Sequence, residues 1–268
     1  MKKNIVSLIL LGICTHAVAE EKLPWYKQWF SGIKSDRVTI STMNYEQLCD
    51  AKERAINNND HVAAIKYLER MAKECPNLET LATIVMELAD LLFDDSKFTK
   101  AVLLYDQYIK SFPGRGQEYV TAYYKKILCS FYQTLEIFRD QSMTEQTLEL
   151  CDSFLETCKH STYEKDVLSI QKDCRQKLAL HELYVADNYI TQNKITSATR
   201  RLTRIREQHI SVPDIEPQLL LTEIRFAETV GNTKFAHERR KELEERFPEH
   251  QSVVIAQAKK PKNMAHRF

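Results

Sequence analysis

The stretch ATIVMELADLLFDDSKFTKAVLLYDQYIKSFP, from Ala82 to Pro113, decides the fold. In it Ala89 is followed twelve places later by Ala101, and Tyr105 stands four residues further on. Small residues at these places let two antiparallel helices approach closely, and the tyrosine fills the groove beside the next pair. Pro113 cannot continue a helix and ends the second one. The segment therefore predicts a helix-turn-helix hairpin.

The same pattern recurs along the chain. Ala64 lies 37 residues before Ala101, and Ala198 lies 38 residues before Ala236. These periods and residue types are those of the tetratricopeptide (TPR) repeat, in which hairpins stack to bury a continuous core. We expect an all-α fold, a right-handed superhelical solenoid of about five TPR helix-turn-helix repeats with about ten helices, over residues 41–250. A helical bundle without repeats is the alternative.

Helix boundaries follow from capping and turn residues. Asn44 and Gln47 have the spacing of a capping box at the start of the first helix. The run NNND at 57–60 predicts the turn of the first hairpin, and Gly231-Asn232 the turn of the last.

The middle of the chain is less regular. We expect a helix from about Glu118 to Phe138, a break at Asp140-Gln141-Ser142 and a second helix from Thr144 to about Cys158. A further helix is predicted from Tyr163 to Tyr189, because no helix breaker stands between them.

The first residues are typical of an export signal. Lys2 and Lys3 precede an apolar run, Ile5 to Ile13, and Ala17-Val18-Ala19 has the spacing of a cleavage site. The run is too short to span a bilayer of roughly 30 Å as a helix. Residues 1–19 are therefore predicted to be a signal peptide, and the protein to be exported.

Cys14 is a candidate for lipidation. Leu11-Gly12-Ile13-Cys14 resembles the lipobox of bacterial lipoproteins, although Ile13 occupies a place that normally holds a small residue. Two alternatives remain: the chain is lipidated at Cys14, or it is cleaved after Ala19 and carries no lipid.

Composition and motifs argue against several functions. Five glycines and a formal net charge of +1 favour neither a glycine-rich phosphate loop nor binding to nucleic acid. His181-Glu182 begins like a zinc-protease motif, but Val185 stands where the second histidine is required. The other six cysteines have no metal-ligand spacing, and most are expected to be small buried residues. We expect no enzyme activity, no cofactor and no metal.

The first helices of TPR hairpins line an extended groove suited to peptides. On that face we expect a substrate peptide groove that includes Glu53, Met86, Asp90, Phe93, Tyr123 and Lys126. The alternative, strongest for Phe93 and Tyr123, is that such residues pack between repeats.

The two ends flank this domain. Residues 20–40 form a predicted linker or cap, in which Trp25 and Trp29 share one helix face. That face either covers the first repeat or lies at a membrane surface. Residues 251–268 are predicted to be a basic, flexible tail.

The stretch LALHELYVADNY at 178–189, with SATRR at 197–201, resembles the fourth repeat of the BamD family. These proteins are TPR lipoproteins of the outer-membrane β-barrel assembly machinery. The irregular break at Asp140-Gln141-Ser142 also resembles that family, and the resemblance covers roughly residues 41–250.

The resemblance implies a non-enzymatic scaffold at the periplasmic face of the outer membrane. Its expected partners are a BamA-like barrel protein with POTRA domains, unfolded outer-membrane β-barrel proteins and other subunits of the complex. Arg201, which matches an arginine of the family, and Arg204 are the expected contacts to the BamA-like partner. Another periplasmic TPR adaptor, which coordinates peptidoglycan or cell-division proteins, is the alternative.

Overall fold

The computed structural model of the chain describes residues 38–75, 77–113 and 115–250. Within these residues the chain is helical and contains no strand. The helices, in chain order, are α2 (Val38–Ser41), α3 (Tyr45–Asn57), α4 (His61–Glu74), α5 (Leu78–Asp94), α6 (Phe98–Ser111), α7 (Gln117–Phe131), α8 (Ser142–Thr157), α9 (Glu164–Thr191), α10 (Ile195–Gln208), α11 (Ile215–Thr229) and α12 (Thr233–Arg246), followed by the 3-10 turn η1 (Pro248–His250).

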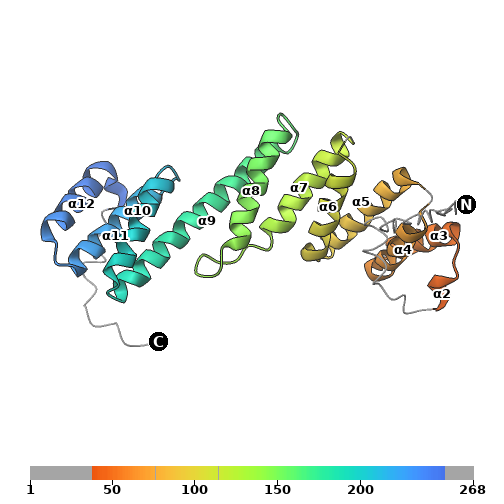
Figure 1. The fold of residues 1–268 in the computed structure, drawn as a ribbon, viewed down its shortest axis with the longest axis horizontal. Helices are drawn as coiled ribbons and strands as arrows, with labels where there is room; N and C mark the ends of the chain where they lie inside the picture. Colours follow the sequence, from red (N-terminus) through yellow and green to blue (C-terminus); the bar gives the residue numbers. More distant parts are fainter. Residues whose placement is uncertain (1–37, 76, 114, 251–268) are drawn as a thin grey trace, which may run out of the picture.

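Helices α3 to α12 form an elongated row, with α3 and α4 at one end and α12 at the other (Figure 1). Helices that follow one another in the chain pack together, so that α3/α4, α5/α6, α7/α8, α9/α10 and α11/α12 are stacked hairpins, and α9 also packs on α11 of the next hairpin. Contacts between neighbouring hairpins define a solenoid. The predicted all-α TPR architecture is confirmed.

The small residues of the repeat lie where the helices cross. Ala64, Ala101, Ala198 and Ala236 are all buried. Tyr105 is fully buried as well, and its hydroxyl donates to Asp90 Oδ1 at 2.5 Å. The repeat pattern therefore encodes close packing between the helices rather than features of the surface.

The hairpin turns repeat one backbone conformation. Asn59, Ser96, Asn193 and Gly231 each have a positive φ, and each lies between the two helices of a hairpin. A left-handed residue ends one helix and lets the chain reverse. The predicted capping box is also present, since the Gln47 backbone N–H donates to the Asn44 side chain at 2.9 Å.

The predicted end of the helix that begins near Glu118 is wrong. Helix α7 ends at Phe131 rather than Phe138, and residues 132–141 form a loop. Two side chains satisfy carbonyls of the last turn: Gln133 Nε2 donates to Cys129 O, and Thr134 Oγ1 donates to Phe131 O, both at 2.8 Å. The long helix predicted after Tyr163 is present as α9.

Four cysteines, Cys129, Cys151, Cys158 and Cys174, are buried in the helix interfaces, whereas Cys49 and Cys75 are half-buried. Burial raises the pKa of the Cys129 thiol and of the Cys151 thiol to about 12. These side chains therefore pack as small neutral groups.

Several predictions concern residues outside the described part of the chain. They are the signal peptide and Cys14, the tryptophan segment and the basic tail. Among the described helices, none is both long and apolar enough to cross a membrane.

Candidate functional site

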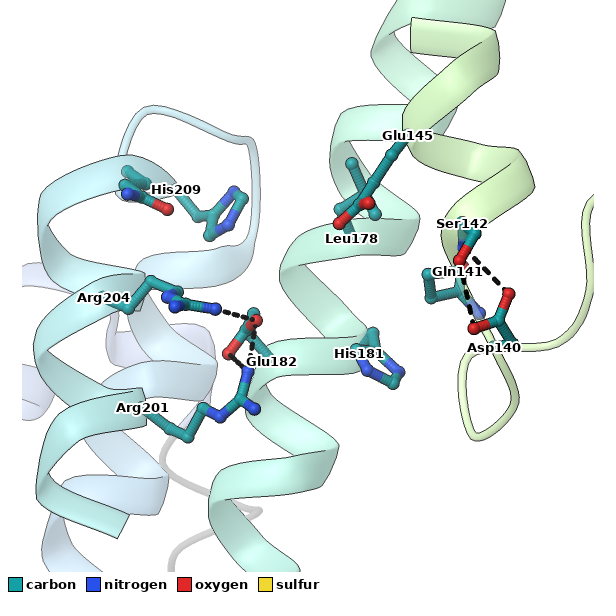
Figure 2. Close-up of a pocket in the computed structure, with 11 residues that line it drawn as sticks. Asp140, Gln141, Ser142, Glu145, Leu178, His181, Glu182, Arg201, Arg204 and His209 are labelled. Carbon is teal, nitrogen blue, oxygen red and sulfur yellow. Dashed lines mark hydrogen bonds and ion pairs between the residues drawn. The ribbon is translucent and has the colours of Figure 1, made fainter. Parts of the chain in front are cut away.

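A cleft of about 410 Å³ lies between the loop at 132–141, the start of α8, helix α9 and helix α10. Asp140, Gln141 and Ser142 form one wall, and Arg201 and Arg204 of α10 form the other (Figure 2). His181 and Glu182 of α9 lie between the two walls.

Glu182 of α9 pairs with both arginines of the charged wall. Arg201 Nη1 donates to both of its carboxylate oxygens, at 2.7 and 2.9 Å, and Arg204 Nη1 donates to Oε1 at 3.2 Å. Glu182 is only 9% exposed, while Arg201 is half-buried and Arg204 is exposed. Hydrogen bonding to Glu182 raises the pKa of Arg201. Two cations share one carboxylate in this wall, and Asp140 and Glu145 line the cleft on the other side.

The helix periodicity places these groups together. Glu182 lies on the buried stripe of α9 with Ala179, Leu183 and Ala186. Arg201 and Arg204 are three residues apart on α10 and therefore share a face. A buried carboxylate needs such a partner, because an unpaired charge in the interior is strongly destabilising.

His209 lines the cleft just after the end of α10. Its pKa is lowered, first by burial and then by the nearby Arg204 charge, whereas Glu182 acts in the opposite direction. The lowered pKa favours the neutral form of the imidazole.

The opposite wall is a loop that is tied down at several points. Gln141 Nε2 donates to the carbonyls of Glu136 and Arg139 at 2.8 and 3.1 Å. Helix α9 holds the loop from the other side: Lys177 Nζ donates to Thr134 Oγ1 at 2.8 Å, and His181 Nδ1 lies 2.5 Å from the Ile137 carbonyl oxygen. The loop has an ordered shape as a result.

This ordered loop exposes apolar side chains beside the charged cleft. Phe138 is 59% exposed and packs edge-on against Tyr184 of α9, with 6.5 Å between ring centroids. Tyr132 and Leu135 are exposed as well. We call Leu135, Phe138 and Tyr184 the loop patch, whereas the ring of Tyr132 packs against Phe93 and Phe98. Exposed apolar groups beside a charged rim are typical of protein-binding surfaces.

The predicted groove residues have mixed surroundings. Glu53 is exposed on α3, and Met86 is half-buried against the core of the first two repeats. Asp90 accepts from Tyr105 and pairs with Lys125 of α7 at 2.8 Å. Thus Asp90 already has partners within the chain.

Three further groove residues also contact neighbouring elements. The ring of Phe93 packs against those of Phe98 and Tyr132, at 5.5 and 6.1 Å between centroids. Tyr123 is 8% exposed and packs against Phe154, and Lys126 pairs with Asp106 of α6 at 2.7 Å. For Tyr123 this burial favours the packing alternative.

Ion pairs join the first helices of neighbouring repeats. Lys52–Glu87 links α3 to α5 at 2.8 Å, Asp90–Lys125 links α5 to α7 at 2.8 Å, and Asp187–Arg225 links α9 to α11 at 2.9 Å. These pairs lie on the helices expected to form the groove, so they help to fix its spacing.

Sequence reasoning missed Glu182 and the loop patch. The signal for Glu182 was available, because this acid stands on the apolar stripe of its helix and must be paired when buried. The loop patch had no such signal. Phe131, Leu135 and Phe138 have the spacing of one helix face, so the sequence predicts a continuing helix there and not an exposed loop.

Comparison with known proteins identifies relatives. Residues 41–252 match the family YfiO, described as an outer membrane lipoprotein. The chain is 22% identical over 168 residues to the outer membrane protein assembly factor BamD of Caulobacter vibrioides, an alignment that covers 63% of this chain and 54% of that protein. A tetratricopeptide repeat protein from Parabacteroides merdae, known from a crystal structure, aligns over 76% of this chain and 67% of its own, with 15% identity and a TM-score of 0.34.

Proposed function

Since the chain belongs to the outer membrane lipoprotein family YfiO, we propose that it is a non-catalytic scaffold of outer-membrane β-barrel assembly. It acts at the periplasmic face of the outer membrane, where it binds a BamA-like barrel protein through POTRA domains and receives unfolded barrel proteins. The assembly role named for the Caulobacter relative supports this proposal, as does the extended TPR surface.

The BamA-like partner docks on the cleft and the loop patch. The observation that carries this assignment is the charge balance at Glu182, where two guanidinium groups share one carboxylate. Arg201 and Arg204 each donate to Glu182 through their Nη1 atom. A partner carboxylate that reaches Arg204 and Arg201 would complete the charge balance, because guanidinium groups bind carboxylates in a planar, two-pronged geometry.

Unfolded barrel proteins bind nearer the N-terminal end of the solenoid, on the first helices of repeats one and two. The groove residues there that remain at least partly exposed are Glu53, Met86, Asp90 and Phe93, of which Asp90 pairs with Lys125. They suit an extended strand that ends in an aromatic residue, with Phe93 as its contact.

The partner assignment is tested by measuring affinity for the BamA-like protein. Arg201→Ala and Arg204→Ala are each expected to weaken binding by roughly 2 kcal/mol or more, because a charged anchor in a desolvated cleft is lost. Arg206→Ala is the matched control: Arg206 pairs with both oxygens of the buried Glu223 at 2.8 and 2.7 Å. The Arg206→Ala variant should lose about as much stability as the other two variants, but little affinity for the BamA-like protein.

Equal losses of affinity for all three variants would mean that the arginines act only through stability or diffuse charge. Capture of peptidoglycan or division proteins in place of a barrel protein would favour the alternative adaptor function.

A further inference from the structure

A second hollow, of about 510 Å³, lies between α4, α5 and α6 in the first two repeats. Its floor includes Ile65 and Leu92, both buried, and its edges carry Val62 and Leu103. Helices α4 and α6 are the second helices of their hairpins, so this surface is separate from the first-helix groove.

Apolar groups are unusually exposed at this hollow. Val62 is 57% exposed on α4, and Leu103 is 49% exposed on α6. Together with the buried floor they offer an apolar strip between two helices. Such a strip favours a ligand with a hydrocarbon part.

The rim of the hollow is positively charged. Lys66, Lys97 and Lys100 line it together with a single carboxylate, Glu69. Lys97 pairs with Asp95 at 2.5 Å. The other two cations are Lys66, which lies on α4 with Glu69, and Lys100, which lies on α6.

Glu69 offsets part of this charge. Burial raises its pKa, although Lys100, Lys73, Lys66 and Lys97 all act to lower it. Three lysines and one carboxylate line the hollow, so the rim keeps its positive character.

We propose that this hollow binds an anionic phospholipid of a membrane surface, with Lys66 and Lys100 on the phosphate and the acyl chain along Val62, Ile65 and Leu103. Lysine side chains suit this role, because their stems lie on apolar surface while the ammonium groups reach the headgroup. An anionic headgroup and a hydrocarbon chain on one molecule match the two halves of the hollow.

The hollow lies in the first two repeats of the solenoid. Helix α2 packs against α4, so the chain enters the solenoid from its N-terminal segment at the helix that forms one edge of the hollow. The inference goes beyond the proposed scaffold function and does not depend on the partner cleft, so either can fail without the other.

The test places a photoreactive amino acid at Leu103 in the full chain. The purified protein is irradiated with vesicles of phosphatidylcholine alone or with added phosphatidylglycerol, and adducts are identified by mass spectrometry. The matched control is the same group at Leu168 of α9, another exposed leucine. Lipid adducts are expected at Leu103, enriched with phosphatidylglycerol and scarce at Leu168.

Charge variants complete the test. Lys66→Glu with Lys100→Glu should reduce lipid adducts by about tenfold, because each lysine near an anionic surface contributes several-fold to binding. Lys66→Gln with Lys100→Gln, which adds no repulsion toward Glu69, should show a smaller loss in the same direction. Lys172→Glu on α9 should change nothing.

The proposal is overturned if lipid adducts form equally at Leu103 and Leu168, or if they ignore both the phosphatidylglycerol and the lysine substitutions. Adducts of Leu103 to another protein in envelope extracts, or to the N-terminal segment of this chain, with no adducts to lipid, overturn it as well.

Discussion

At the scale of single residues, two buried glutamates pair with three of the arginines of α10. Glu182 pairs with Arg201 and Arg204, and Glu223 pairs with Arg206. Removing one member of a buried pair is strongly destabilising, because the other charge stays desolvated. The two sites share the same ion-pair chemistry. They differ in that the Glu182 cluster has two cations and lies beside an exposed apolar loop.

His209 gives this cluster a pH dependence. Its pKa is lowered in the folded protein by burial and by Arg204, so the unfolded chain binds a proton more readily. The contribution of His209 to stability is present above its unfolded pKa, near 6.5, and is lost as the pH falls through the lower folded pKa.

We therefore expect the free energy of unfolding to decrease as the pH falls below about 6.5. Replacing His209 by Gln should reduce this decrease, and His237→Gln on α12, where the histidine is exposed, should not. Denaturant titrations at a series of pH values measure both. An unchanged pH dependence in His209→Gln would contradict the burial argument.

At the scale of elements, the repeats were predictable because their signals are local. Alanines at fixed spacing predict where two helices pack closely, and the polar run at 57–60 predicts where the chain reverses. The end of α7 was not predictable in the same way. Leu135 and Phe138 continue the apolar spacing of a helix, whereas the bonds that hold the loop come from Lys177 and His181, more than 40 residues away.

The turn of the last hairpin allows a test of the repeat geometry. Gly231 has φ of +76°, and an added Cβ would meet no atom within 4 Å. Gly231→Ala should therefore destabilise the protein by about 1 kcal/mol through backbone strain alone. Gly231→Asn should lose less, because asparagine tolerates the left-handed conformation that Asn59 and Asn193 already adopt. Thermal melts compare the two, and equal midpoints would argue against the strain.

At the scale of the whole molecule, the solenoid separates two expected activities along its length. The groove residues lie on α3, α5 and α7, and the arginine cluster lies on α9 and α10. The sequence predicted these regions on different repeats, since position along a solenoid follows position along the chain. It named packing between repeats as the alternative for Phe93 and Tyr123 but could not decide between groove and packing, because that depends on contacts between hairpins.

The central claim is that the cleft and the loop patch bind a BamA-like protein. The most direct measurement is photo-crosslinking in the cell envelope from Phe138, the most exposed side chain of the loop patch, with Val230 at the turn after α11 as the exposed control. The account predicts adducts from Phe138 to the periplasmic POTRA region of a barrel protein, absent at Val230 and reduced by Arg204→Ala. Adducts from Phe138 to cell-wall enzymes alone, or the same products from both positions, would contradict it.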